Sequence, residues 1–530
     1  MDIRPRTRKK GDRVMSIPST VKPTEFPTGY ILIVAILAFV GYLIVTAFYS
    51  SIKKDRAYLN NGAIDKSDKL LVVWLLLAAF AFRIVISHYV VGHKTDIGCF
   101  TAWGERAAAQ GFASFYTNGF SDYPPGYIYV LSLMSKLSAL LGHGVRLADG
   151  SYDLVCVFFN KLPSIIADLA SAYLVYKLAR KKLRFEPSFL LMALVAFNPV
   201  ILYVSAGWGQ IDQILTVLLA CAILLLINNK PIFAGIVYGF AILMKPQALM
   251  AGPMLAIAYI FYVFDDNFFA VTDVKCTDSR GKRLLKTAIA VACACLMIVL
   301  SALPFSSKEM PWYQIILQKY LGTATSYEFA TINAYNIYAL FGANWASIDK
   351  VAFLGINYGT LGTIGMVVSI GFSAVLYIIG RKKNRGALVL STAYLFASIF
   401  TIGHYMHERY IIPALLLLLI AYLLYSDKRL LYLMVGYTFP IFINCLCSFY
   451  YSKMFEYGLY WDKKLVFWCS LLMVLAFFYF TYIVIRIMIQ GKLKGDVFED
   501  GTNLRVGSSV SDRLRGGVKT TKGATNENKA

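Results

Sequence analysis

The chain has 530 residues, of which 58% are hydrophobic and 15% aromatic, with a mean hydropathy of +0.59 and a formal net charge of +22. This apolar content excludes an ordinary soluble protein, because apolar blocks near the roughly 20 residues that cross a bilayer recur from end to end. The basic residues form short clusters beside these blocks, which favours anionic lipid over nucleic acid as their partner. The composition therefore predicts an all-α polytopic membrane protein that binds no nucleic acid.

The sequence divides into three parts. A basic arm over residues 1–29, expected to be flexible, precedes a membrane domain over residues 30–489. A polar tail over residues 490–530 follows, and its composition is typical of a disordered cytoplasmic segment. Two long polar stretches interrupt the membrane domain and are predicted to be outer loops, at residues 92–153 and 304–350.

The membrane domain is predicted to hold about 12 or 13 spanning helices. In chain order, the apolar stretches cover residues 30–50, 70–91, 154–176, 188–205, 211–227, 231–244, 248–264, 285–303, 351–379, 387–402, 411–425, 430–450 and 465–489. Residues 97–108 have the periodicity of a helix lying in the membrane interface. Two assignments stay open: whether residues 30–50 cross or lie flat, and whether residues 126–141 cross or form a loop helix.

The basic clusters predict which side each loop faces. If residues 126–141 do not cross, five clusters share one side, at residues 177–184, 228–230, 265–286, 381–385 and 427–429. The positive-inside rule makes this side cytoplasmic, so that the polar motifs face outward. If residues 30–50 also span, the basic arm lies outside against that rule, and the side of the N-terminus therefore stays open.

Six short polar motifs fall at the predicted outer ends of the helices. They are Asp96 in the first outer loop, Asp122-Tyr123-Pro124-Pro125, Gly207-Trp208-Gly209-Gln210-Ile211-Asp212-Gln213, Met244-Lys245-Pro246-Gln247, Asn333-Ala334-Tyr335-Asn336 and Met406-His407-Glu408-Arg409-Tyr410. In order and common side, these motifs resemble the GT-C superfamily of polyprenyl-phosphate-sugar-dependent glycosyltransferases. The resemblance covers residues 70–425. It is greatest to a bacterial branch related to the second mannosyltransferase of GPI-anchor synthesis, and more distant to the glucosyltransferases that extend dolichol-linked oligosaccharides.

The resemblance implies a GT-C fold with interfacial helices in the first large outer loop, and a reaction that inverts the sugar C1 with a lipid phosphate as leaving group. The sugar is expected to be a hexose, with mannose favoured, and the acceptor a lipid, glycan or protein hydroxyl. By family position, Asp96 is the general base that takes the proton of the acceptor. Many relatives carry two adjacent acids in this loop, whereas Asp96 is followed by Ile97. The alternative is that Asp96 caps the interface helix.

The leaving phosphate requires cations or N–H donors. The candidates that the motifs supply are His407, Arg409, Lys245 and Arg83. For Arg409 the alternatives are an ion pair with Glu408 or a snorkelling side chain. Arg83 lies deeper in its span and equally suits neutralisation of Asp168.

Sugar and acceptor binding is assigned to the remaining polar residues of the motifs, namely Asp122, Tyr123, Trp208, Gln210, Asp212, Asn333, Asn336 and Glu408. Turn formation and helix capping are the alternatives for most of them. No set of His, Asp and Glu has metal-site spacing, so no metal or other cofactor is expected, and a divalent ion between Asp96 and Asp122 is the less favoured alternative.

Two other classes of function compete with the enzyme. A flippase or transporter of lipid-linked sugars predicts inverted repeats and polar residues at mid-bilayer depth, which the sequence offers only in Arg83 and Asp168. A scaffold of an envelope complex leaves the motifs without a role. We therefore expect a multi-pass glycosyltransferase of a bacterial plasma membrane whose active site faces outside.

Overall fold

The computed structural model describes residues 66–271, 274, 276–322, 328–455 and 463–495. The basic arm, the 30–50 segment and the tail beyond residue 495 lie outside these residues. In the described part, seven helices are long and apolar enough to cross a membrane, and an eighth span exists if the bent pair Phe185–Ala196 and Pro199–Trp208 counts as one. The all-α polytopic fold expected from the sequence is confirmed.

The helices that could cross come from both halves of the chain. They are α2 (Lys66–Tyr89), α5 (Leu154–Ala179), η2 with α10 (Pro246–Ala251 and Gly252–Phe264), α11 with η3 (Arg280–Ala302 and Leu303–Phe305), α14 (Tyr358–Gly380), α17 (Lys428–Phe455) and α18 with η6 (Lys463–Val484 and Ile485–Ile489).

Four shorter apolar helices pack among these spans. They are α8 (Asp212–Ile227), α9 (Pro231–Met244), α15 (Ala387–Ile402) and α16 (Ile412–Tyr425). Nearly every residue of α15 and α16 is buried, as expected of helices that are apolar all round. At 1.5 Å per residue, 14 to 16 residues reach roughly 21–24 Å, less than the hydrocarbon thickness. The predicted total of about 12 or 13 spans is met only if these short helices count as crossings.

The predicted span 188–205 is bent in the structure. Helix α6 (Phe185–Ala196) ends before Asn198-Pro199, and α7 (Pro199–Leu202) continues into the π-helix η1 (Tyr203–Trp208). A residue before proline is disfavoured in the helical conformation. The Asn198 side chain instead accepts from the backbone N–H of Val200 at 3.0 Å, so it ends one helix and caps the next. This bend turns the end of η1 toward the first outer loop.

The predicted span 351–379 begins later than expected. Residues Val351–Phe353 form β2 and Ile356–Asn357 form β3, an antiparallel hairpin that precedes α14. Leu354 and Gly355 between the strands have φ of 48° and 79°, which a helix does not allow. A second short pairing joins β1 (Thr331–Ile332) to β4 (Met406–His407) in parallel.

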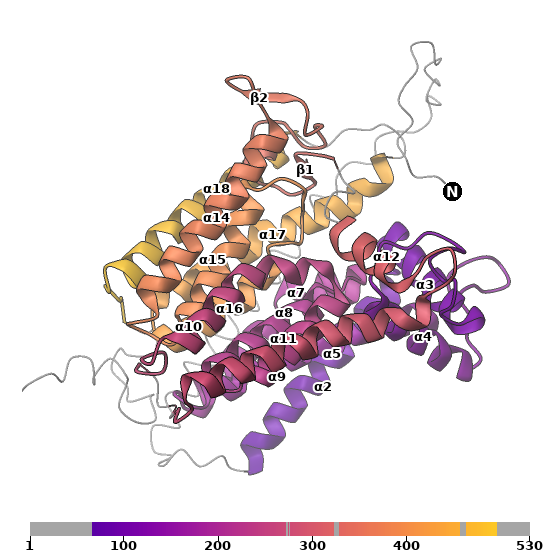
Figure 1. The fold of residues 1–530 in the computed structure, drawn as a ribbon. Coiled ribbons are helices and arrows are strands. Elements are labelled where there is room, and N and C mark those ends of the chain that lie inside the picture. Colours follow the sequence, from indigo (N-terminus) through magenta and orange to yellow (C-terminus); the bar gives the residue numbers. More distant parts are fainter. Residues whose placement is uncertain (1–65, 272–273, 275, 323–327, 456–462, 496–530) are drawn as a thin grey trace, which may run out of the picture.

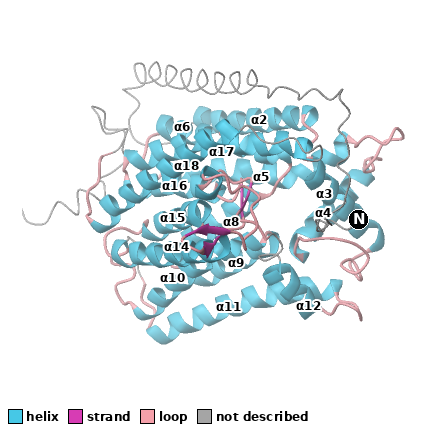
Figure 2. Cartoon of the chain, turned by 90° about the horizontal axis from the view of Figure 1, so that it is seen from above, coloured by secondary structure: helices cyan, strands magenta, loops and turns pink. Residues whose placement is uncertain are grey.

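The first outer loop folds into two helices packed on each other, α3 (Lys94–Gln110) and α4 (Pro125–Leu140). Neither is among the candidate spans or the shorter apolar helices of the described residues, which favours a loop helix over a crossing for residues 126–141. An aromatic cluster holds the pair together, with Phe100, Trp103 and Tyr127 packed near Phe305. Figures 1 and 2 both show α3, α4 and the short helix α12 (Trp312–Ile316) at one end of the bundle.

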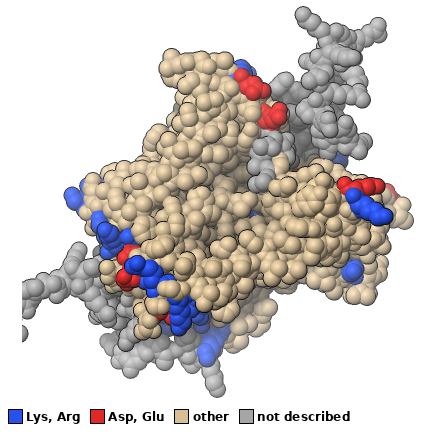
Figure 3. All heavy atoms as spheres, viewed as in Figure 1, with Lys and Arg blue, Asp and Glu red and all other residues tan. Residues whose placement is uncertain are grey.

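The opposite end of the bundle carries the basic clusters. Lys182 Nζ donates to the carbonyls of Leu423 at 2.7 Å and Leu424 at 3.2 Å, at the C-terminus of α16. Lys383 Nζ likewise donates to Ile489 at 2.5 Å, at the end of η6. The last carbonyls of a helix lack partners within it and carry the negative end of its dipole. Figure 3 shows Lys and Arg along this edge and a broad face with few charges beside it.

Candidate active site

Asp96 lies in the first turn of α3, at the end of the bundle away from the basic clusters. Its Oδ2 accepts a hydrogen bond from Trp208 Nε1 at 2.5 Å, and His93 Nδ1 lies 3.4 Å from the same oxygen. The N-cap position of α3 belongs to His93, so Asp96 does not cap the helix. The structure thus directs the Asp96 carboxylate toward side chains from another part of the chain.

The neighbours of Asp96 keep it ionised. Burial raises the pKa of its carboxyl, whereas the charges of Arg409 and His93 lower it. Hydrogen bonds from Gln210 and Trp208 lower it further, and the net pKa lies below the ordinary value of an aspartate. Its side chain stays 23% exposed, so a solvent-borne group has access to it. An ionised, reachable carboxylate is what a general base requires.

Two cations share a buried carboxylate next to Asp96. Lys245 Nζ lies 2.7 Å from Asp212 Oδ1, and Arg409 Nε lies 3.4 Å from Asp212 Oδ2. Arg409 is also ion-paired with Glu408, as the alternative reading of the sequence had it. Asp212 is fully buried and Glu408 nearly so. Their position suits the holding of cations better than the binding of a sugar directly.

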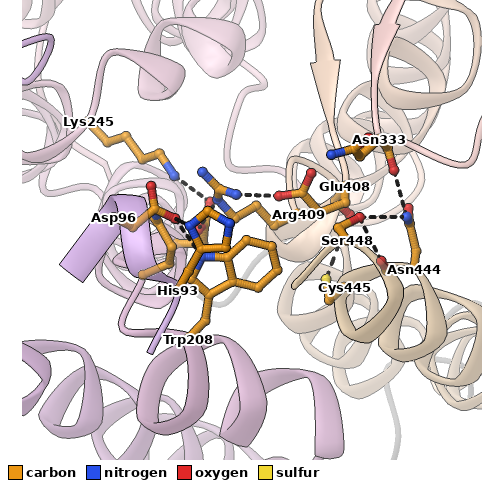
Figure 4. Close-up of polar contacts among 12 residues, drawn as sticks. His93, Asp96, Trp208, Lys245, Asn333, Glu408, Arg409, Asn444, Cys445 and Ser448 are labelled. Carbon is orange, nitrogen blue, oxygen red and sulfur yellow. Dashed lines mark hydrogen bonds and ion pairs between the residues drawn. The ribbon is translucent and has the colours of Figure 1, made fainter. Parts of the chain in front are cut away.

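Trp208 connects the acid with the cations. Its indole N–H binds Asp96, the guanidinium of Arg409 lies 5.1 Å from the centre of its ring, and His93 stacks on it at 5.1 Å. A guanidinium over an indole face is attracted by the ring quadrupole. Figure 4 shows Lys245, Asp96, His93 and Trp208 on one side of Arg409 and Glu408 on the other.

His407 lies beside this cluster but adds no charge at neutral pH. Burial lowers its pKa, as do the charges of Arg409 and Lys245, to about 3. Its strand β4 pairs with β1, which places Asn333 opposite His407. A neutral imidazole can still donate one N–H to an anion, and so a hydrogen-bonding role remains open to it.

The two predicted asparagines, Asn333 and Asn336, make different kinds of hydrogen bond. Asn333 Oδ1 accepts from Trp345 Nε1 at 2.7 Å, and its carbonyl accepts from Asn444 Nδ2 at 2.6 Å. Asn336 is fully buried; its Oδ1 accepts from Tyr338 N at 3.1 Å at the start of α13 (Ile337–Leu340). Its Nδ2 donates to the carbonyl of Phe400 at 3.1 Å. Asn336 is therefore engaged in capping, whereas Asn333 lies near the cluster.

The Asp122 motif contributes to the same end of the bundle. Tyr123 Oη lies 3.2 Å from Gln210 Oε1, which ties the first loop to the segment after η1. Burial raises the pKa of Asp122, and the charge of Asp96 raises it further, although Lys319 and Arg409 oppose the shift. The carboxylates of Asp122 and Asp96 therefore repel each other, as expected of two like charges that lie near the same site.

Arg83 is not part of the cluster. Its Nε donates to Asp168 Oδ2 at 2.8 Å, and both side chains are fully buried. Ser205 of η1 donates to the same carboxylate oxygen. This is the alternative left open from the sequence, and it favours a structural role for Arg83 over phosphate binding.

Sequence reasoning gave no role to two residues of the site. His93 is one of them, because its stacking on Trp208 depends on contacts between distant segments. Lys319, whose Nζ donates to the carbonyl of Ser121 at 2.6 Å, comes from the second outer loop. The sequence offered a sign of its importance: Lys319 is a basic residue on the predicted outer side, where such residues are depleted. In the described part of the chain, no three His, Cys, Asp or Glu residues form a metal-binding group.

Comparison with known proteins bears on the middle of this chain. Residues 118–319 match the ALG6, ALG8 glycosyltransferase family. A stretch of 197 residues is 23% identical to the dolichyl pyrophosphate Glc1Man9GlcNAc2 alpha-1,3-glucosyltransferase of Arabidopsis thaliana, covering 36% of this chain and 38% of that relative. The alignment therefore spans well under half of the relative's length.

The family match covers part of the cluster. It includes the Asp122 motif, η1 with Trp208, Asp212 and Lys245, but neither Asp96 nor the segment of Arg409. It supports the glycosyltransferase resemblance on its glucosyltransferase side. The likeness to the GPI mannosyltransferase and to a bacterial branch stays a prediction.

Proposed function

We propose that the chain is an integral membrane glycosyltransferase that moves a hexose from a polyprenyl phosphate to an acceptor hydroxyl, inverting the sugar C1. One observation carries this proposal: an ionised, partly exposed Asp96 lies beside the buried Lys245 and the mostly buried Arg409, with Trp208 bound to both the acid and the guanidinium. A base next to a phosphate-binding group is what such a transfer requires.

In the proposed reaction, the acceptor oxygen attacks C1 while its proton passes to an Asp96 carboxylate oxygen. The bond between C1 and the phosphate oxygen breaks, and the electron pair leaves on the lipid phosphate. A phosphate is already a weak base, so its departure requires no strong acid. The low pKa of Asp96 is compatible with this role because proton transfer accompanies bond formation.

Arg409 and Lys245 are proposed to receive the leaving phosphate. Arg409 presents a planar fork for two phosphate oxygens, and Lys245 a point charge. Lys245 is paired with Asp212, and Arg409 with both Asp212 and Glu408, so these carboxylates hold the two cations in place. His407 is proposed to donate one neutral N–H to the same phosphate.

Tyr123, Gln210, Asp122 and Asn333 are proposed to bind the sugar or the acceptor. The named activity of the Arabidopsis relative favours glucose as the hexose, whereas the GT-C resemblance favours mannose. We propose that the site faces outside, because the basic clusters mark the other end of the bundle as cytoplasmic. No metal or other cofactor is proposed, and membrane lipids surround the helices.

The test is to supply purified protein with labelled polyprenyl-phosphate-glucose and polyprenyl-phosphate-mannose in separate reactions, together with an extract of candidate acceptors. We expect label to move from one donor to a product. Asp96→Asn should slow the transfer by about 10²- to 10⁴-fold, whereas Asp149→Asn, which changes an exposed carboxylate of the same loop, should not. Donor translocation across a vesicle without transfer would favour the flippase alternative.

A further inference from the structure

Lys161 is a buried lysine whose side chain donates hydrogen bonds to three backbone carbonyls. It lies on α5 with no exposed surface. Its Nζ donates to the carbonyls of Val90 at 2.6 Å, Ala206 at 2.7 Å and Gly207 at 3.2 Å. A charged side chain at membrane depth is costly unless such groups compensate it. Its presence therefore requires an explanation beyond packing.

The three carbonyls belong to two helix ends. Val90 follows the last residue of α2, and Ala206 and Gly207 lie in the last turn of η1. Carbonyls at a helix C-terminus lack partners within the helix and carry the negative end of its dipole. Lys161 thus joins the ends of two helices from a third, and Ser87 Oγ adds a second donor to Ala206 at 3.2 Å.

Both helix ends lead directly into the candidate active site. The chain passes from Val90 through His93 to Asp96, and from Gly207 to Trp208. The carbonyl of Trp208 accepts from the N–H of His93 at 3.2 Å. A Cβ on Gly92, whose φ is 124°, would lie 2.9 Å from that carbonyl. The two segments are therefore in close contact above the ammonium.

We propose that Lys161 is a positioning residue for the Asp96–Trp208 pair. By binding both helix ends, it holds the indole N–H within reach of the carboxylate. Lys161 touches no substrate in this role, which rests on the proposed function of Asp96 as a base. Its contribution is the geometry of one hydrogen bond between two distant segments.

Loss of this geometry should shift the pKa of Asp96 in a direction that can be measured. In Lys161→Met the bond from Trp208 weakens, and because that bond lowers the pKa of Asp96, the pKa rises. Asp96 works ionised, so the acid limb of the kcat/KM profile moves to higher pH. We also expect kcat/KM at neutral pH to fall roughly tenfold. Lys161→Arg keeps N–H donors for these carbonyls and should restore part of the loss.

Lys182→Met is the matched control. Lys182 also donates to two carbonyls at a helix C-terminus, but at the basic end of the bundle. Its loss should lower stability and leave the acid limb where it is. A purely structural Lys161 would behave in the same way as Lys182.

A second readout is independent of transfer. Tryptophans are replaced by 5-fluorotryptophan, and the fluorine signal of Trp208 is assigned by its loss in Trp208→Phe. Its pH titration reports the ionisation of Asp96. We expect the midpoint to move to higher pH in Lys161→Met and to stay in Lys182→Met, even if the protein transfers no sugar. An unchanged midpoint in folded Lys161→Met overturns the inference.

If Lys161→Met does not fold, Ser87→Ala removes the second donor to Ala206 with less disturbance. We expect a shift of the same sign and smaller size. An unchanged fluorine titration in Ser87→Ala, with Lys161→Met unfolded, also overturns the inference.

Discussion

The two ends of α16 both carry charge, but they arrange it differently. At its C-terminus, Lys182 donates to helix carbonyls and, nearby, Arg429 pairs with Asp427. At its N-terminus, Arg409 is shared among Glu408, Asp212 and the ring of Trp208. The first arrangement closes helix ends. In the second, several groups depend on one guanidinium.

Charged side chains thus bind helix carbonyls at one end of α16, whereas at the other they form the cluster proposed to bind phosphate. A cation bound to helix carbonyls has no reason to move when a ligand arrives. A cation that shares carboxylates can redistribute its hydrogen bonds when a phosphate joins them. The following predictions ask whether the two ends respond differently to the same kind of change.

The largest expected effect is at Asp96. Asp96→Asn removes the proposed base while keeping the shape of the side chain, and the transfer rate should fall by about 10²- to 10⁴-fold. Initial rates with labelled donor measure it. Wild-type rates in folded Asp96→Asn would remove Asp96 from the mechanism.

Substitution of Arg409 tests the difference between the two ends of α16 most directly. Arg409→Gln leaves Glu408 buried without its cation and leaves Asp212 with Lys245 alone, which should cost about 3–5 kcal/mol of stability as well as activity. Arg409→Gln with Glu408→Gln should recover stability but not transfer. At the basic end, Arg280→Gln separates an exposed pair with Asp266 and should cost about 1 kcal/mol or less. Thermal unfolding in detergent measures all three, and equal losses at both ends would contradict the comparison.

Trp208→Phe should act mainly through pH. It removes the hydrogen bond from the indole N–H that helps to lower the pKa of Asp96, so the carboxyl takes up its proton at a higher pH. The acid limb of kcat/KM moves upward, and activity at neutral pH falls roughly tenfold. A pH–rate profile measures the shift. Trp468→Phe, an exposed tryptophan of α18, is the control and should leave the profile unchanged.

The smallest expected effect is that of a chelator. Asp96 is bound by Trp208 and approached by His93, and the proposed phosphate ligands are side-chain cations. EDTA should therefore leave the rate unchanged. A loss of transfer that Mg²⁺ or Mn²⁺ restores would return the divalent ion between Asp96 and Asp122 to consideration.

Much of the architecture was predictable because membrane spans reveal themselves by length and apolarity. The bend at Asn198-Pro199 could also have been predicted from the sequence, since proline disfavours the helical conformation in the residue before it. The hairpin before α14 was missed because Val351 to Ile356 is as apolar as a span. The site was predictable as a set of motifs, but not in its pairings: that Trp208 binds Asp96, or that Lys161 closes two helix ends, depends on contacts between distant segments.

The length of α16 sets the depth of the site. Its 14 residues separate Arg409 from the carbonyls that Lys182 binds, a rise of roughly 21 Å. A hydrocarbon layer is about 30 Å thick. If the carbonyls that Lys182 binds lie at its cytoplasmic boundary, the guanidinium at the other end of α16 lies below the outer boundary of the lipid tails. A lipid phosphate would then enter by sinking into the protein from the side, while its tail stays in the leaflet. The acceptor, in contrast, must descend from the water above.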